Sequence, residues 1–315
     1  FTPVDTVDFA FLQTADWLTT APNDGYRAIA RGEKWGGEGM YGWFRTTYRV
    51  TDALQGKRLF LMPHIGCYEG MLFVNGEPFG TFANKHQVQY TEHGNHYCDR
   101  FAESAAAGEE IELTLELYCG HFDPGNHPFS KPGKTDFTYT YGGADICVKN
   151  EAYQEFYFDL RTVRQLAQVL PEDDFRRGQA VAALYQIHNR IMYDAENAEG
   201  DAFFDALREC QPLLKQFLSS ACSDSAPFAG LTGHSHMDTA WLWHVGETVK
   251  KCARTYSNAL NLMDQYPEYR FLQSSSCHSH FMQKYYPGLF ERIRQKVKEG
   301  RYEPNGGVWV ECDCN

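Results

Sequence analysis

The spacing of apolar residues changes its period near residue 160, and this change excludes a fold built from one kind of layer. Between residues 39 and 150, β-branched and aromatic runs alternate with polar residues and end at turn residues, as strands do. From about residue 160, apolar residues recur at helical spacing. A chain of 315 residues also exceeds the size at which one core usually stops growing, roughly 250–300 residues. The sequence therefore predicts a multidomain protein.

Two stretches carry the β prediction. In IELTLEL, residues 111–117, the apolar side chains fall on one face of a strand and Glu112, Thr114 and Glu116 fall on the other. In MLFVNGEPFGTF, residues 71–82, Asn75 and Gly76 separate two apolar runs, which is a strong signal for a tight hairpin turn. We predict an N-terminal antiparallel β-sandwich, jelly-roll-like, over residues 1–155, with a Gly- and Pro-rich surface loop at 120–136.

A helical connector is predicted over residues 156–225. Its apolar residues at helical spacing are Leu166, Val169, Leu170, Val181, Leu184, Ile187, Ile191, Met192, Phe203, Phe204, Leu207, Leu213, Leu214 and Leu218.

Strands and helices alternate in residues 226–315. We predict a buried strand at 228–233, a helix at about 245–265, a strand at 269–274, helices up to Glu299 with Pro287 beginning the second, and a strand within 301–312. This order is typical of a parallel α/β sheet. Active sites of such sheets lie at the carboxyl ends of the strands.

Composition restricts the partners and the compartment. The net charge of −12 repels phosphate and anionic lipid, so we expect neither a nucleic acid nor a membrane surface as partner. No apolar run reaches the ~18 residues of a membrane helix, and the first twenty residues do not resemble a signal peptide. The ten cysteines are scattered without a dense framework. We therefore predict a soluble, cytoplasmic protein with reduced thiols.

The stretch GHSHMDTAWLW, residues 233–243, predicts a metal site. In an extended segment His234, His236 and Asp238 point to one side, and imidazole and carboxylate groups suit Zn²⁺ or a similar ion. Asp313 follows the last predicted strand and should reach the same edge. Cys312 and Cys314 flank Asp313, so we interpret them as packing residues.

The tryptophans of this stretch narrow the class of site. A metallo-β-lactamase-like site requires a histidine where Thr239 stands, and the Trp241–Trp243 pair is foreign to amidohydrolase barrels. The flat face of a tryptophan stacks on the C–H face of a sugar ring. We predict this role for Trp241 and core packing for Trp243.

The C-terminal stretch from about Leu231 resembles the catalytic domain of glycoside hydrolase family 38, the class II α-mannosidases. The segments that carry the resemblance are HSHMDTAWLW, ETVKKCARTYSNALNLMDQYPEYRF and YYPGLFERIRQKVKEGRYEPNGGVWVECDCN. The sandwich and connector resemble, less strongly, the cytosolic and vacuolar subgroup. The resemblance implies the first β/α units of a seven-stranded (β/α) barrel in residues 226–315 and assembly into a homo-oligomer.

The same resemblance implies the roles of individual residues. His236, Asp238 and Asp313 would bind one zinc ion, or cobalt in its place, together with a histidine later in the family sequence. Asp313 would also be the nucleophile, and Trp241 would pack on the mannose. The implied reaction is retaining hydrolysis of α-linked mannose in oligosaccharides through a covalent intermediate.

Two departures from the family pattern and two alternatives accompany this reading. The chain ends at Asn315, before the family's fourth ligand and acid/base carboxylate, so we expect no turnover from this polypeptide alone. In place of QSSSCHSH, residues 273–280, the family usually has a Gln-rich stretch that contains an aromatic residue, which leaves substrate contacts near Ser275 and Cys277 open. We expect His278 and His280 at a helix start or on the surface.

The alternatives are a deacetylase-like metal-dependent hydrolase and a carbohydrate-binding protein whose platform would include Tyr68 and Phe122.

Overall fold

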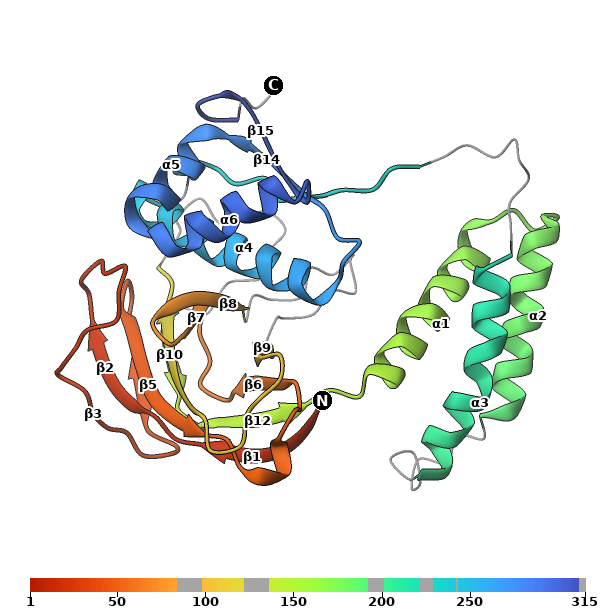
Figure 1. The fold of residues 1–315 in the computed structure, drawn as a ribbon, viewed down its shortest axis with the longest axis horizontal. Coiled ribbons are helices and arrows are strands. Elements are labelled where there is room, and N and C mark those ends of the chain that lie inside the picture. Colours follow the sequence, from red (N-terminus) through yellow and green to blue (C-terminus); the bar gives the residue numbers. More distant parts are fainter. Residues whose placement is uncertain (84–97, 122–135, 192–200, 221–228, 242, 312–315) are drawn as a thin grey trace. The chain divides into compact units, whose positions relative to one another are not determined.

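The computed structural model describes residues 1–83, 98–121, 136–191, 201–220, 229–241 and 243–311 (Figure 1). The chain divides into two compact units, residues 1–148 with 230–315, and residues 149–229. In the described part, no helix is long and apolar enough to cross a membrane. The loop predicted at 120–136 falls mostly on residues outside the described part.

Two antiparallel sheets make up the β-rich part of the first unit. Their strands are β1 (Thr2–Val7), β2 (Ala10–Thr14), β3 (Arg27–Ala28), β5 (Tyr41–Arg49), β6 (Leu59–Pro63), β7 (Glu69–Val74), β8 (Glu77–Ala83), β9 (Asp99–Ala102), β10 (Glu110–Tyr118) and β12 (Ala144–Val148). The larger sheet has the order β3-β2-β5-β10-β7-β8 and the smaller β1-β12-β6-β9. A separate two-stranded antiparallel sheet pairs β4 (Lys34–Gly36) with β11 (Thr138–Thr140). Side chains of both sheets, including Phe44, Leu61 and Leu115, share one buried core, which confirms antiparallel β structure here; the jelly-roll connectivity stays a prediction.

The hairpin between β7 and β8 has the predicted turn. Asn75 and Gly76 both have positive φ, 50° and 81°, which asparagine and glycine adopt at the least steric cost. The side-chain oxygen of Asn75 also accepts a hydrogen bond from the Glu112 amide at 2.9 Å. The turn is therefore held to the neighbouring strand β10 as well as closed on itself.

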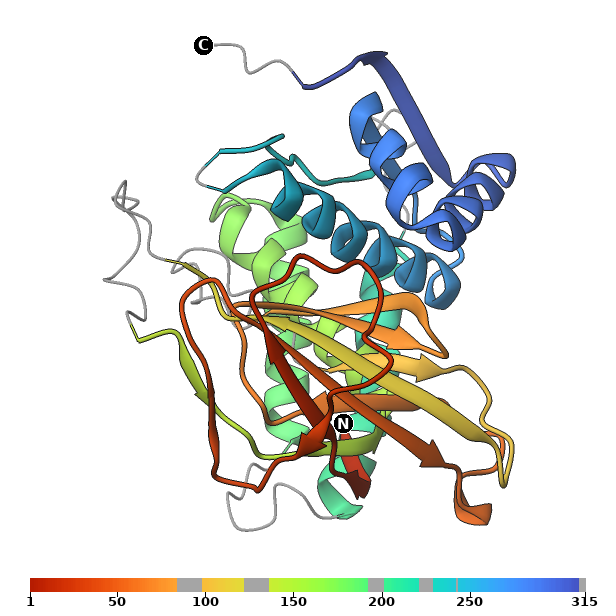
Figure 2. The same ribbon diagram turned by 90° about the vertical axis from the view of Figure 1, so that its left-hand side faces the viewer.

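Strand β10 has the predicted alternation, but both of its faces are buried. Leu113 and Leu115 face the core between the sheets. Thr114 and Glu116, on the opposite face, are only 1% and 0% exposed. Helix α4 (Val245–Gln265) covers that face of the larger sheet, as Figure 2 shows, and Lys250 of this helix contacts Glu116. The alternation thus predicted the strand correctly, but it did not predict that the polar face is buried.

The C-terminal part of the first unit is an α/β arrangement. Its elements are β13 (Gly233–His234), α4, β14 (Phe271–Ser275), α5 (Ser276–Tyr285), α6 (Pro287–Lys298) and β15 (Tyr302–Val308). The three strands are parallel in the order β13-β14-β15. The helix at 245–265 and the helix start at Pro287 are confirmed. The buried strand predicted at 228–233 is wrong: Leu231 is 90% exposed, because the chain joins the sheet only from Gly233.

The second unit consists of α1 (Glu151–Val169), α2 (Phe175–Arg190) and α3 (Asp201–Leu218). Apolar residues at the predicted helical spacing form its core. Helix α1 begins ahead of the spacing visible in the sequence because the Asn150 side chain accepts a hydrogen bond from the Tyr153 amide and caps the helix.

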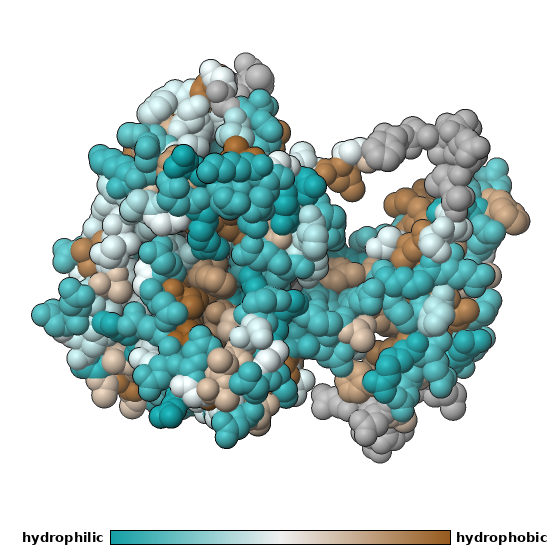
Figure 3. Space-filling view, viewed as in Figure 1, coloured by the Kyte–Doolittle hydropathy of each residue, from teal (hydrophilic) through white to brown (hydrophobic). Residues whose placement is uncertain are grey.

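The apolar side chains of the described residues gather in three buried cores, two of them in the first unit. One core lies between the two sheets. Another joins the outer face of the larger sheet to helices α4, α5 and α6, and its members include Trp43 and Phe73 of the sheet and Val249 and Leu260 of α4. The face of the molecule in Figure 3 is largely hydrophilic, and hydrophobic residues appear on it in small separate patches.

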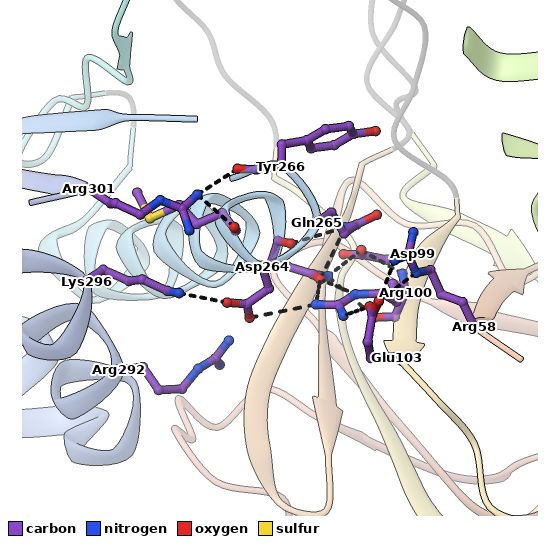
Figure 4. Close-up of polar contacts among 12 residues, drawn as sticks. Arg58, Asp99, Arg100, Glu103, Asp264, Gln265, Tyr266, Arg292, Lys296 and Arg301 are labelled. Atoms are coloured by element: carbon purple, nitrogen blue, oxygen red, sulfur yellow. Dashed lines mark hydrogen bonds and ion pairs between the residues drawn. The ribbon is translucent and has the colours of Figure 1, made fainter. Parts of the chain in front are cut away.

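Polar contacts also join strand β9 to helices α4 and α6 (Figure 4). The side-chain oxygen of Asn261 accepts from Arg100 Nε at 2.9 Å, and its amide nitrogen donates to Asp99 Oδ1 at 2.7 Å. Asp264 lies 3.7 Å from Arg100 Nη2 and 3.0 Å from Lys296 Nζ. Buried polar groups of this kind are stabilising only with their partners in place, so these contacts fix the orientation of α4 on the sandwich.

Candidate functional site

The predicted site residues lie at the carboxyl ends of the parallel strands. His234 ends β13, and His236 and Asp238 follow it. Ser274 lies near the end of β14, and Glu311 comes three residues after the end of β15. Because the strands are parallel, these ends meet at one edge of the sheet.

His236 stands between two carboxylates. Its Nε2 lies 3.4 Å from Asp238 Oδ1, and its Nδ1 lies 2.8 Å from Glu311 Oε2. Tetrahedral zinc with ligands at ~2.0–2.2 Å places neighbouring ligand atoms about 3.3 Å apart, so the separation of His236 from Asp238 fits two ligands of one ion. The contact with Glu311 is the one that a metal-binding imidazole usually makes through its other nitrogen. These two donors therefore fit a zinc-type cation that takes its further ligands from other residues.

The Glu311 carboxylate, which follows β15, contacts polar groups in or just after the other two strands. His234 Nε2 lies 3.1 Å from Glu311 Oε1, while His234 Nδ1 contacts the Leu272 carbonyl at 3.0 Å. The Ser274 hydroxyl donates to the same carboxylate. Burial raises the pKa of Glu311, but the Ser274 hydrogen bond and the charges of His234 and His236 outweigh it and hold the pKa below its usual value. The ionised carboxylate can therefore orient His236.

Two tryptophans follow these residues with different surroundings. Trp241 is 54% exposed, and its ring packs edge-on against Trp243 at 5.5 Å. Trp243 is partly buried; its indole Nε1 donates to Thr248 Oγ1 at 3.0 Å, and Lys251 Nζ lies 4.5 Å from its ring centroid. Trp241 thus presents much of its ring to solvent, whereas Trp243 is held by Thr248 and Lys251. Their roles in sugar stacking and packing stay predictions.

Of the two positions expected for His278, a helix start or the surface, the helix start is confirmed. His278 lies in the first turn of α5 and is fully buried. Its Nδ1 is 3.0 Å from Gln273 Nε2, and its Nε2 is 2.8 Å from Thr239 Oγ1. Burial lowers the pKa of His278 to about 4, so the neutral ring accepts from Gln273 and donates to Thr239. This histidine connects β14 and α5 to the residue after Asp238; His280 is exposed.

A hollow of about 440 Å³ opens beside the site. His236, Asp238 and Trp243 line it from the α/β part, and Glu69 and Thr81 line it from the sandwich. The sandwich therefore contributes to the surroundings of the candidate site.

Several predicted residues lie outside the described part: Asp313, Cys312, Cys314 and Phe122. Among the described residues, no group of three or more His, Cys, Asp and Glu side chains is arranged to hold a metal ion. Glu311 is the residue that sequence reasoning missed. Its signal was present, because Glu311 precedes Asp313 by two residues and shares a side with it in an extended segment.

The same region is similar to a known protein family. Residues 229–315 match the model of the Glycosyl hydrolases family 38 N-terminal domain. The chain is 30% identical over 293 residues to alpha-mannosidase G of Dictyostelium discoideum, covering 92% of this chain and 26% of that protein. It is 29% identical over 296 residues to human alpha-mannosidase 2C1, with the same two shares. The chain thus spans about a quarter of the length of these relatives. Among solved structures, a beta-glucuronidase of Faecalibacterium prausnitzii aligns at 11% identity and a TM-score of 0.29, covering 46% of this chain and 30% of that one.

Proposed function

Because residues 229–315 match the model of the N-terminal domain of glycoside hydrolase family 38, we propose that the chain is part of a retaining α-mannosidase acting on mannose-containing oligosaccharides. One observation carries this proposal: within the matched residues, His236 is set between Asp238 and Glu311, and Trp241, five residues after His236, is 54% exposed. This arrangement combines ligands for a cation with an apolar face for a sugar ring.

The side chains divide the work of binding. His236, Asp238 and Asp313 would hold zinc, or cobalt in its place, with a further ligand from elsewhere in the enzyme. When bound, the cation would supply a Lewis acid for hydroxyl groups of the mannose. Trp241 stacks on the opposite, apolar side of the ring, and Glu311 keeps His236 in the orientation needed for ligation.

The reaction proceeds in two displacements. The Asp313 carboxylate attacks the anomeric carbon and forms a bond to it, while the bond to the leaving oxygen breaks and a second carboxylic acid gives that oxygen its proton. Water then displaces Asp313, with the second residue acting as base, and mannose leaves with its original anomeric configuration. Positioning by Trp241 and the ligand side chains places the anomeric carbon close to Asp313.

The domain arrangement that we propose has three parts: a sandwich at 1–155, a helical connector at 156–225, and the first units of a seven-stranded (β/α) barrel at 226–315. The parallel order β13-β14-β15, with helices between the strands, supports the barrel. We further propose a cytoplasmic homo-oligomer that binds neither nucleic acid nor membranes, since a net charge of −12 disfavours both.

Hydrolysis of 4-nitrophenyl α-mannoside by the full-length protein tests the function. We expect activity on this substrate and none on the β-mannoside. Activity should be lost after dialysis against a chelator and return with zinc or cobalt, because the cation would bind the sugar hydroxyls. Release of 4-nitrophenol measures each step. Undiminished activity after verified metal removal, or hydrolysis of acetylated substrates instead, would rule out the proposal in favour of another hydrolase.

Glu311→Gln tests the metal-binding role of the site separately from turnover. The amide no longer carries the charge that orients His236, so zinc affinity should fall by about 10–100-fold, measured by competition with a chromogenic chelator. Glu303→Gln is the matched control, because Glu303 is exposed on β15 and should leave affinity unchanged. Equal affinities in Glu311→Gln and wild type would contradict the assignment.

A further inference from the structure

Thr248 is a buried residue in the first turn of α4, and its hydroxyl makes three hydrogen bonds to the segment that precedes the helix. It accepts from the Ala240 amide at 3.0 Å and from the indole Nε1 of Trp243 at 3.0 Å. It donates to the Asp238 carbonyl at 3.4 Å. Its side chain is fully buried. One hydroxyl thus holds the segment that contains both a predicted ligand and the two tryptophans.

These contacts use the full capacity of the group. A hydroxyl has one hydrogen to donate and two lone pairs to accept, and all three are engaged. Serine offers the same set, whereas valine has the same shape without it. The backbone at Ala240 depends on this support, because φ there is +65° in a residue with a Cβ. Such a conformation persists where the surroundings determine it from several sides.

The residue next to Thr248 fixes the helix end to the sandwich. Glu247 is buried and accepts from the Tyr41 hydroxyl at 3.0 Å and from Arg254 Nη1 at 2.6 Å. The first turn of α4 is therefore a fixed point relative to the larger sheet. The segment 238–243 is held to that fixed point through Thr248.

We propose that Thr248 is a positioning residue of the proposed glycosidase site. Its hydroxyl fixes the turn from Asp238 to Trp243, so that the carboxylate of Asp238 and the ring of Trp241, on either side of Ala240, are presented to the same ligand. The functional part of this inference rests on the proposed mannosidase activity. The geometric part does not, and the two have separate measurements.

The first measurement follows the turn itself in the 315-residue chain. With tryptophans labelled by ¹⁵N, the indole signal of Trp243, assigned by its loss in Trp243→Phe, should shift and exchange with water faster in Thr248→Val, because the indole loses its acceptor. Thr248→Ser should keep the wild-type signal. Ser257→Ala is the matched control: among the described residues, the buried Ser257 hydroxyl of the same helix has no hydrogen-bond partner, so its loss should leave the signal in place.

The second measurement is activity of the full-length protein on the aryl α-mannoside. Thr248→Val should lose about tenfold or more in kcat/KM, because the Ala240 amide and the Trp243 indole lose the acceptor that holds the turn, while Thr248→Ser and Ser257→Ala stay within about threefold of wild type. If Thr248→Val does not fold, the double variant Trp243→Phe/Thr248→Val removes one stranded donor with its acceptor and should fold; its loss of kcat/KM relative to Trp243→Phe then replaces the single comparison.

The outcomes separate the two ideas. A shifted indole signal with wild-type kcat/KM would reduce Thr248 to a structural residue and overturn the proposal, as would an unshifted signal. A wild-type protein without α-mannosidase activity would refute the proposed function and the functional role of Thr248 with it, while the indole measurement would still decide whether Thr248 holds the turn.

Discussion

Lys250→Met should lower the free energy of unfolding of the first unit by about 3–5 kcal/mol, the scale of removing one partner from a buried ion pair. Lys250 is fully buried, with its Nζ 2.8 Å from Glu116 Oε1 and 3.8 Å from the ring centroid of Tyr41. The substitution leaves Glu116 charged and buried with Arg254 alone, whose Nη2 is 3.5 Å away. Urea denaturation followed by circular dichroism measures the change.

The size of this effect comes from the network around Lys250. Three carboxylates and three cations meet between the larger sheet and α4, and their charges cancel; they are Glu69, Glu116, Glu247, Lys250, Lys251 and Arg254. Burial lowers the pKa of Lys250, although Glu116 opposes the shift. The other oxygen of Glu116, Oε2, has no hydrogen-bond partner among the described residues. Neither charge is therefore stable in this interior without the other.

Two variants separate this explanation from the loss of a long side chain. Lys298→Met, at the exposed end of α6, should change stability by no more than about 0.5 kcal/mol. Glu116→Gln combined with Lys250→Met should cost less than the sum of the single substitutions, because the uncompensated carboxylate is gone. Strict additivity, or a wild-type urea midpoint in Lys250→Met, would show that the pair is not coupled as the structure indicates.

The same network shows where sequence reasoning about the fold stops. The turn at Asn75 and Gly76 was predictable because its cause, positive φ, lies within two residues. The burial of Glu116 was not, because Lys250 follows 134 residues later and only the packing of α4 on the sheet brings the two together. The strand expected at 228–233 failed for a related reason, since an apolar run does not reveal whether anything covers it.

In the candidate site, too, contacts between residues close in sequence were predictable and contacts between distant segments were not. His236 and Asp238 were predictable as neighbours because a two-residue spacing in an extended segment places them on one side, and their atoms lie 3.4 Å apart. Glu311 was missed because its two histidine partners lie about seventy-five residues earlier, in strand β13 and just after it. The helix start expected as one position for His278 is confirmed, but its burial was not predictable because its partners, Gln273 and Thr239, come from two different segments.

Asp313→Ala should abolish α-mannosidase activity in the full-length protein, with kcat lower by about 10³-fold or more, as when a nucleophile is removed. Asp313 lies outside the described residues, but Glu311, two positions before it, contacts His236 at 2.8 Å. Just before Asp313, the chain therefore lies at the edge of the parallel sheet where His236 is found. Cys312→Ser is the control: Cys312 points away from Asp313 if the strand continues, so this variant should keep activity within about threefold.

Loss of activity alone would not distinguish a nucleophile from a ligand, since Asp313 is proposed as both. A 2-deoxy-2-fluoromannosyl fluoride separates the roles, because its fluorine slows the second displacement more than the first and leaves the sugar bound to the attacking carboxylate. Mass spectrometry of the digested wild-type enzyme should find the fluorosugar on the peptide that contains Asp313. Azide is a nucleophile small enough for the space left in Asp313→Ala. It should attack the anomeric carbon of an activated substrate from the face opposite the leaving group and give the β-mannosyl azide. We expect this product only where zinc is still bound. Label on another carboxylate, or normal hydrolysis by Asp313→Ala, would place the nucleophile elsewhere and leave Asp313 at most a ligand beside His236 and Asp238.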